Sequence, residues 1–247
     1  MSILTRIYLN SSKRRFTKNF TPLGFKGKAD FLISMPHQVG SALEALAIVG
    51  GLHKKGRIVL LLPEVLTNIC RFLKLQKYET IYYKTPLKLF SKEYKSLKEI
   101  LSTKKFDYLI ELNEPPNIAI PYLVPVERRI SFYTEKIYPY YNILIKDNLQ
   151  TLAEFFNIKQ YKLKNFFAFN LKEKKEVLQK FNKKKPLLFI NDKDTEVWNG
   201  DRIAVDEEIS LSDPELYRIL YFSDAYCGRR DELYKCAKLF NKKIIEE

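Results

Sequence analysis

Residues 30–63 read DFLISMPHQVGSALEALAIVGGLHKKGRIVLLLP, and this stretch decides the fold class of the chain. A short apolar run at 30–35, ended by Pro36, is typical of a buried strand. Residues 40–53 are rich in Ala and Leu, which predicts a helix, and a second apolar run follows at 57–62. A strand, a helix and a strand at this spacing predict a βαβ unit, whose two strands are parallel.

The same alternation continues along the chain and predicts an α/β protein built around a Rossmann-like parallel sheet. Apolar and β-branched runs predict further strands at 80–83, 106–112, 129–133, 187–190 and 243–245. Helical periodicity predicts further helices at 64–74, 91–101, 148–157, 173–181, 214–220 and 231–240.

The net charge of +14 is unevenly spread along the chain and divides it into four segments. We expect a basic N-terminal arm at 1–28 with a charge of +7 and a Rossmann-like domain at 29–158. A Lys-rich linker and helix at 159–185 carries +8, and a reduced C-terminal α/β domain at 186–247 carries −5. A basic front and an acidic rear favour an anionic partner held by the first two-thirds of the chain.

Composition excludes several classes of protein. With 247 residues and 46% apolar residues, the chain can bury a sizeable core, which argues against global disorder. Three scattered cysteines and two histidines do not have the spacing of a disulfide framework or a zinc site, so we expect a reducing compartment and no metal. The chain contains no apolar run of eighteen residues and no signal-peptide core, which predicts a cytoplasmic protein.

The arm at 1–28 has seven basic residues and no acidic one. Three interpretations stay open: a solvated extension, an organellar transit peptide, or an arm that contacts phosphates or lipid head groups at the inner membrane. The Lys-rich stretch adds a fourth interpretation, because its lysines alternate with Tyr161, Phe166, Phe167 and Phe169, and aromatic rings beside cations can stack on nucleic-acid bases.

The loop after the first strand is the first candidate site, because ligands of parallel sheets bind at the carboxyl ends of the strands. It contains His37, Gln38, Gly40 and Ser41. Gly40 permits a close turn into the helix, and the free N–H groups at a helix start can bind an anion. The loop matches neither a dinucleotide-binding nor a P-loop motif, so an ordinary strand-to-helix turn remains the alternative.

The order of several short motifs resembles the family 9 glycosyltransferases, the ADP-heptose:lipopolysaccharide heptosyltransferases. The first strand and its Pro/Gly loop are followed by LLLP at 60–63, FDYLIEL at 106–112, ERRISFY at 127–133 and NLQTLAEFFNI at 148–158. The resemblance covers roughly residues 29–158. It implies a GT-B fold, a role in lipopolysaccharide biosynthesis, a nucleotide-sugar donor and no required metal or other cofactor.

The resemblance also implies a general base, an acidic residue directly after the glycine of the first turn. Ser41 stands at that position, after Gly40. A serine hydroxyl with no base beside it cannot take a proton at neutral pH, and His37 is the candidate to replace the missing carboxylate. The sequence therefore leaves open whether the protein is an active transferase or a catalytically inactive scaffold or binding protein.

The second half keeps parts of the segment that holds the donor's diphosphate in that family. Asp224 and Gly228 match it in altered spacing, and Arg229 and Arg230 follow where the family pattern differs. Two arginines at a helix start can bind phosphate, since their bidentate contacts add to the helix dipole. The candidate ligand-binding residues are thus Gln38, Gly40, Ser41, Asp224, Gly228, Arg229 and Arg230, for a nucleotide sugar or another anionic ligand; nucleic acid and anionic membrane are the alternative partners.

Overall fold

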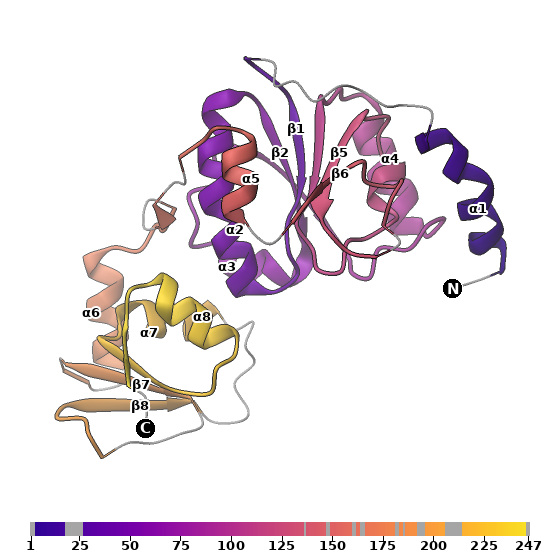
Figure 1. Cartoon of the computed structure of the whole chain (residues 1–247). Coiled ribbons are helices and arrows are strands. Elements are labelled where there is room, and N and C mark those ends of the chain that lie inside the picture. Colours follow the sequence, from indigo (N-terminus) through magenta and orange to yellow (C-terminus); the bar gives the residue numbers. More distant parts are fainter. Residues whose placement is uncertain are drawn as a thin grey trace. The chain divides into compact units, whose positions relative to one another are not determined.

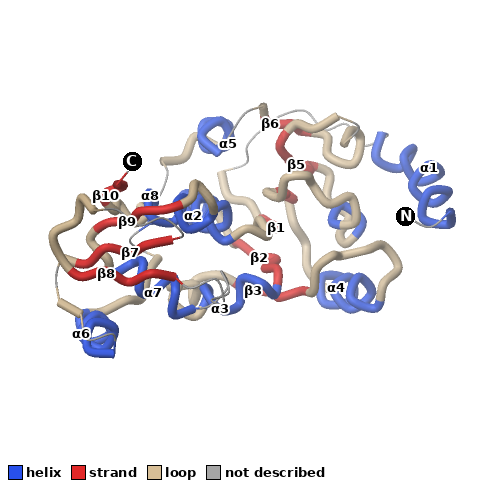
Figure 2. The backbone as a smooth tube through the Cα atoms, turned by 90° about the horizontal axis from the view of Figure 1, so that it is seen from below, coloured by secondary structure: helices blue, strands red, loops and turns tan. Residues whose placement is uncertain are grey.

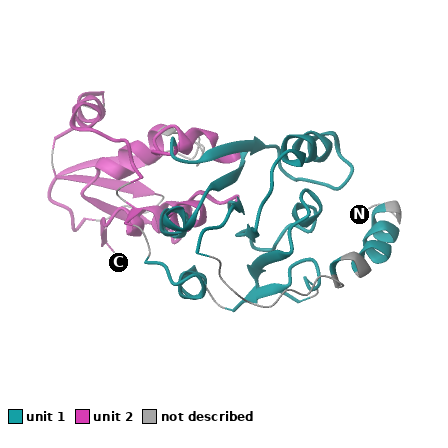
Figure 3. Cartoon of the chain, turned by 90° about the horizontal axis from the view of Figure 1, so that it is seen from above, with its two compact units in different colours: residues 1–36, 47–64, 76–161 teal, residues 37–46, 65–75, 162–247 magenta. Residues whose placement is uncertain are grey.

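The computed structural model describes residues 3–17, 27–135, 137–146, 149–159, 162–163, 166–180, 183–184, 186–191, 196–205 and 214–245. The chain forms two compact units (Figure 3). The first unit consists of residues 1–36, 47–64 and 76–161, and the second consists of residues 37–46, 65–75 and 162–247. The Rossmann-like domain predicted at 29–158 therefore begins and ends in the first unit. Two segments within it, 37–46 and 65–75, belong to the second unit.

A six-stranded parallel sheet forms the centre of the first unit (Figure 1). Its strands run in the order β3-β2-β1-β4-β5-β6, and each neighbouring pair is parallel. This is the strand order of a Rossmann sheet, so the predicted fold class is confirmed. The strands are β1 (Phe31–Ser34), β2 (Ile58–Pro63), β3 (Glu79–Tyr83), β4 (Tyr108–Glu111), β5 (Arg128–Phe132) and β6 (Ile143–Ile145).

Helices cover both faces of this sheet. On one face, Leu97 of α4 and Leu9 of α1 pack in a core cluster with Leu32 and Leu109 of the sheet. On the other face, the ring of Phe156, next to α5, meets those of Phe31 and Tyr108 edge to face. The helices are α1 (Ile3–Thr17), α2 (Val39–Leu52), α3 (Thr67–Cys70), α4 (Lys92–Ser102) and α5 (Leu149–Phe155), with 3₁₀ turns at His53–Lys55, Glu64–Leu66 and Ile120–Tyr122.

The basic N-terminal arm contains a helix that the sequence analysis did not predict. Leu9 and Phe16 of α1 are buried, and the Ser12 and Tyr122 hydroxyls lie 2.6 Å apart. The rings of Phe16 and Tyr122 also meet edge to face, with centroids 4.9 Å apart. The described part of the arm therefore packs against the first unit and is not a solvated extension; residues 18–26 lie outside the described residues.

The second unit contains a smaller parallel sheet with the order β10-β9-β7-β8 (Figure 2). Its strands are β7 (Leu187–Asn191), β8 (Asp201–Val205), β9 (Ala225–Gly228) and β10 (Lys243–Ile245). Its helices are α6 (Leu171–Lys180), α7 (Pro214–Phe222) and α8 (Glu232–Leu239), which lie close to the helices predicted at 173–181, 214–220 and 231–240. The second α/β segment expected from the sequence is confirmed.

One predicted helix is much shorter than expected. Residues 64–74 were predicted as one helix, but the structure has a 3₁₀ turn followed by the four-residue α3. The chain leaves helical geometry because Leu73 pairs with Phe167 in an antiparallel bridge and the Lys74 amide donates to the Phe166 carbonyl. A tertiary backbone contact thus overrides the local helical periodicity.

Candidate functional site

The first candidate region lies where the strand order of the first sheet reverses, between β1 and β4. Ser34 ends β1, Glu111 ends β4, and the two residues are register partners. In open parallel sheets, ligands bind outside the carboxyl ends of the strands at this reversal. The loop that carries His37, Gln38, Gly40 and Ser41 begins directly after β1, as the sequence analysis expected.

Glu111 is a fully buried acidic residue at this position. Its Oε1 accepts hydrogen bonds from the backbone and side-chain amides of Asn113, and its Oε2 accepts one from the Tyr141 hydroxyl at 3.4 Å. Asn113 Nδ2 also reaches Ser34 Oγ at 3.3 Å and the Met35 carbonyl at 3.2 Å. Burial raises the pKa of Glu111 to about 7, although these hydrogen bonds oppose the rise.

This network holds the carboxyl ends of β1 and β4 together and fixes the start of the candidate loop. Glu111 has no exposed surface, and its hydrogen bonds hold the neighbouring groups in place. The sequence analysis quoted FDYLIEL as a strand but assigned no role to Glu111. A single acidic residue at the inner end of an apolar strand was the signal that could have identified it.

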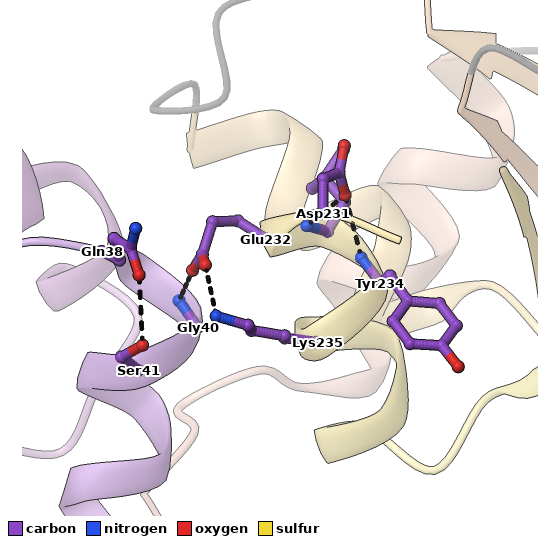
Figure 4. Close-up of polar contacts among 8 residues, drawn as sticks. Gln38, Gly40, Ser41, Asp231, Glu232, Tyr234 and Lys235 are labelled. Carbon is purple, nitrogen blue, oxygen red and sulfur yellow. Dashed lines mark hydrogen bonds and ion pairs between the residues drawn. The ribbon is translucent and has the colours of Figure 1, made fainter. Parts of the chain in front are cut away.

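In the candidate loop, His37 and Gln38 are exposed, whereas Gly40 is buried and Ser41 is half-buried. The Ser41 hydroxyl donates to Gln38 Oε1 at 3.4 Å, within the first turn of α2 (Figure 4). Burial lowers the pKa of His37 from its ordinary value, which favours the neutral imidazole. The loop therefore places a neutral imidazole and a hydroxyl at the start of one helix.

Gly40 contacts α8 directly, within the second unit. Its amide donates to Glu232 Oε2 at 2.7 Å, and Lys235 Nζ lies 2.9 Å from the other oxygen of the same carboxylate (Figure 4). A Cβ at position 40 would lie 2.7 Å from Glu232 Oε2 and 3.0 Å from Lys235 Cβ, so a larger residue would displace the Glu232 carboxylate from the Gly40 amide. The helix-start amide that we expected to bind an external anion therefore binds a carboxylate of the chain itself.

The second candidate region is the carboxyl edge of the second sheet. Gly228 ends β9 opposite Asn191 of β7, and a Cβ on Gly228 would lie 2.0 Å from the Asn191 carbonyl oxygen. Its φ of 148° also favours glycine. Asn191 Nδ2 donates to Asp231 Oδ2 and to the Tyr226 hydroxyl, both at 2.9 Å. The start of α8 is thereby fixed to the end of β7.

Asp231 caps α8, since its Oδ1 accepts the Leu233 and Tyr234 amides at 2.8 and 3.2 Å (Figure 4). Arg229 and Arg230 lie just before this cap and are exposed. The guanidinium carbon of Arg230 lies 5.9 Å from the centroid of the Tyr234 ring. The edge therefore presents two arginines to solvent beside the carboxylates of the first turn of α8.

Asp224 lies at the opposite end of β9. Its Oδ2 accepts the Leu187 amide at 2.8 Å, and its own amide donates to the Leu187 carbonyl at 2.8 Å. The four-residue strand β9 separates Asp224 from Arg229 by five residue steps, a distance of roughly 16 Å at about 3.3 Å per residue. The structure thus brings Gly228, Arg229 and Arg230 together but leaves Asp224 at the amino edge, where it connects β7 and β9.

The Lys-rich stretch contributes to the core of the second unit. Phe166 and Phe167 are buried, and the Phe167 and Phe169 rings stack with centroids 5.4 Å apart. Buried rings are not available to stack on bases; Tyr161 lies outside the described residues. Trp198 packs against the second core cluster, and its Nε1 donates to the Asp201 carbonyl at 3.2 Å.

Further properties concern the described part of the chain as a whole. All three cysteines are buried, and none of them forms a disulfide. Within the described ranges, His, Cys, Asp and Glu side chains do not gather in threes around a common point that a metal ion could fill. No described helix has both the length and the apolar character needed to cross a membrane.

The chain matches no protein-family model and no curated protein sequence. Several solved structures resemble it in fold, and three of them are glycosyltransferases of bacteria. ADP-heptose lipopolysaccharide heptosyltransferase II of E. coli aligns with a TM-score of 0.59 at 12% identity, over 87% of this chain and 83% of the other. A family 9 glycosyl transferase of Veillonella parvula aligns with a TM-score of 0.59 at 11% identity, over 92% of this chain and 81% of the other.

The third structure is the E. coli heptosyltransferase WaaC with ADP-2-deoxy-2-fluoro heptose, with a TM-score of 0.53 at 11% identity over 87% of each chain. At these identities the likeness concerns the fold. It agrees with the fold that the motif order in the first half of the sequence indicated. The chain therefore has the α/β, GT-B-type fold of the family 9 glycosyltransferases.

Proposed function

We propose that this protein binds a nucleotide diphosphate sugar at the carboxyl edge of its second sheet. The observation that carries the proposal is the pair Arg229 and Arg230, exposed between the end of β9 and the start of α8. The fold supports the proposal, because the WaaC structure contains an ADP-heptose analogue. Guanidinium groups suit a diphosphate, since each can donate two parallel hydrogen bonds to phosphate oxygens.

The carboxylates beside the arginines oppose such a ligand. Asp231 caps α8 and Glu232 lies in its first turn, where a diphosphate would otherwise gain from the helix dipole. Glu232 also holds the Gly40 amide. We therefore expect weak binding, in the micromolar to millimolar range, that strengthens when the negative charge at position 232 is removed.

Titration calorimetry with ADP-, GDP- and UDP-sugars tests the binding. We expect saturable heat with at least one of them and at least tenfold weaker binding by the double variant Arg229→Gln, Arg230→Gln. Arg202→Gln is the matched control, because Arg202 lies near the amino end of β8. Absence of heat with all three classes of donor contradicts the proposal, as does an equal loss of affinity in the control.

Glu232→Gln tests the role of the internal carboxylate. Glutamine keeps an oxygen that can accept the Gly40 amide but removes the charge, so we expect the affinity for the same donor to rise about threefold to tenfold. The gain should shrink as salt is added, because the removed repulsion is electrostatic. Weaker binding by Glu232→Gln would mean that the carboxylate supports the bound state.

A second candidate function is sugar transfer with His37 as the general base. The lowered pKa of His37 favours this role, because a neutral imidazole can accept a proton near pH 7. If His37 acts as the base for sugar transfer or donor hydrolysis, the protein should release nucleotide diphosphate from the donor. The rate of release should fall at least tenfold in His37→Gln and stay unchanged in Ser41→Ala. A protein that only binds predicts no release by the wild type and a gain in Ser41→Asp, which restores a carboxylate after Gly40.

A further inference from the structure

Arg129 is a buried cation with incomplete hydrogen bonding. It is the second residue of β5, and only 1% of its surface is exposed. Its Nε donates to the Tyr140 carbonyl at 2.8 Å, and its Nη1 donates to the carbonyls of Val126 and Glu127 at 2.6 and 3.2 Å. Its Nη2 is buried and has no hydrogen-bond partner.

Removing a guanidinium from water is costly unless it gains both hydrogen bonds and an opposite charge. Three backbone carbonyls supply part of the hydrogen bonding that the Arg129 guanidinium needs. The Phe16 ring, whose centroid lies 4.7 Å from the guanidinium carbon, adds a cation–π contact. Within the described residues, however, no carboxylate lies within ion-pair distance of Arg129, and only the exposed Glu127 carboxylate two residues away attracts it electrostatically.

Arg129 also lines a cavity of about 360 Å³ in the first unit. The cavity lies among α1, α4, the segment before β5, and β5 itself, all of which can be followed in Figure 1. Lys98 of α4 supplies a second cation, and its exposed position places it at the rim. The remaining lining is Phe16, Pro121, Tyr122, Leu123, Val124, Pro125, Val126 and Glu127, of which Glu127 is exposed.

We propose that this cavity binds a small organic oxyanion, a carboxylate or a phosphate monoester, and that the Arg129 guanidinium, which lines the cavity, turns so that its Nη2 donates to the charged end of the ligand. The apolar part of the ligand lies against Tyr122 and Leu123, and Lys98 attracts the anion at the entrance. A volume of about 360 Å³ is at the lower end of the range for small-molecule pockets, which favours a compact ligand over a nucleotide sugar.

This site is separate from the proposed donor site. It lies near the amino end of β5, whereas the carboxyl ends of the strands carry the Glu111 network, and Arg229 and Arg230 belong to the second unit. Arg128, the preceding residue, provides a matched reference. Successive strand residues point to opposite faces, and the Arg128 guanidinium lies 5.3 Å from the Tyr108 ring on the other face.

Titration calorimetry and thermal shift on the full chain, with benzoate, phenyl phosphate and inorganic phosphate as probes, test the proposal. We expect saturable binding of benzoate or phenyl phosphate and a melting temperature that rises with its concentration. Benzoate alone would identify the ligand class as a carboxylate, and phenyl phosphate alone as a phosphate monoester. Binding of inorganic phosphate as tight as that of phenyl phosphate would contradict the apolar part of the proposal.

Arg129→Lys keeps the charge but removes the planar fork, so we expect at least tenfold weaker binding, while Arg128→Lys changes affinity less than twofold. Lys98→Glu lies on the surface and should not unfold the protein, so it tests the site even if position 129 tolerates no change. We expect it to weaken binding at least fivefold. Unchanged affinity in both Arg129→Lys and Lys98→Glu, or no saturable binding by the wild type, overturns the proposal.

An excess of ADP separates this inference from the proposed function. We expect ADP at saturating concentration to leave benzoate or phenyl phosphate affinity unchanged, because the two ligands occupy different sites. If the organic anion binds with the expected variant pattern but no nucleotide does, the proposed function fails and this inference stands. Displacement of the probe by ADP would show that the cavity is not an independent site.

Discussion

Glu111 and Arg129 are both fully buried charged residues on neighbouring strands of the first sheet, but their environments differ. Both oxygens of Glu111 accept hydrogen bonds, from Asn113 and Tyr141. Arg129 meets three backbone carbonyls, while its Nη2 has no acceptor. The hydrogen-bonding atoms of the Glu111 carboxyl therefore all have partners within the fold, whereas those of the Arg129 guanidinium do not.

The two groups also differ in how they can lose their charge. Burial raises the pKa of Glu111 to about 7, so the carboxyl can take up a proton near neutral pH and become neutral. A guanidinium keeps its charge at every accessible pH, even though burial lowers the pKa of Arg129 from its ordinary value. A buried acid can thus be stable without a counterion, whereas a buried arginine with an open donor calls for an external anion.

The largest effect should follow the loss of Arg129. Arg129→Met removes the donors of three buried carbonyls, so we expect the free energy of unfolding to fall by about 4 kcal/mol, even after the relief of a buried charge. Arg128→Met should cost less than about 1 kcal/mol, because Arg128 is only half-buried. Urea unfolding followed by circular dichroism measures both; equal losses would contradict the contrast drawn between the two arginines.

Glu111 should make stability depend on pH. Its folded pKa of about 7 lies above its ordinary value of 4.5, so the folded state prefers the protonated form. The resulting stabilisation is complete below pH 4.5 and is lost as the pH rises through 7. Because one pKa unit corresponds to about 1.4 kcal/mol, the wild type should lose roughly 3 kcal/mol relative to Glu111→Gln between pH 5 and pH 8.

Glu215→Gln is the control for this pH profile. The pKa of Glu215 is lowered, chiefly by its hydrogen bond to Lys180, so any contribution that it makes is lost only below pH 4.5. Urea unfolding between pH 5 and pH 8 should therefore give parallel curves for Glu215→Gln and the wild type. A curve for Glu111→Gln that also runs parallel to the wild type would mean that Glu111 is not the titrating group.

The central strands of the first sheet could be predicted because each is an uninterrupted apolar run. β6, β8 and β9 could not: β6 has three residues, β8 begins with Asp201 and Arg202, and β9 contains small residues and ends in glycine. α1 was missed because the basic bias of the arm at 1–28 drew attention away from two apolar residues that are buried, Leu9 and Phe16. Short strands and this helix depend on tertiary contacts that local composition does not encode.

The candidate site shows the same limit. The loop at His37–Ser41 could be predicted because it follows an apolar strand of a parallel sheet, whereas Gly228–Arg230 was found through the family resemblance and the helix predicted at 231–240. Glu232 could not be, because its role arises from a contact with Gly40, 192 positions away in the sequence. Asp224 matched the family pattern by sequence, but only the strand assignment of 225–228 shows that it lies at the other edge.

Tyr140 and Tyr141 give the smallest and most closely matched test of how a buried polar group is satisfied. The Tyr141 hydroxyl has two acceptors within reach of its single proton, the Asn117 carbonyl at 2.7 Å and Glu111 Oε2 at 3.4 Å, whereas the Tyr140 hydroxyl reaches the Leu9 carbonyl at 3.5 Å. We expect Tyr141→Phe to lower the free energy of unfolding by about 1 kcal/mol and Tyr140→Phe by less than half of that.

Tyr141→Phe should also change the pH profile, which a merely structural loss would not do. The hydrogen bond from Tyr141 lowers the pKa of Glu111, so its removal should raise that pKa further above its ordinary value and move the midpoint of the stability profile to higher pH. Urea unfolding across the same pH range measures this shift, with Tyr140→Phe keeping the wild-type midpoint. If the midpoint of the stability profile instead moves to lower pH in Tyr141→Phe, the Tyr141 hydroxyl accepts a hydrogen bond from protonated Glu111. In that case Glu111 is the donor of this hydrogen bond and not its acceptor.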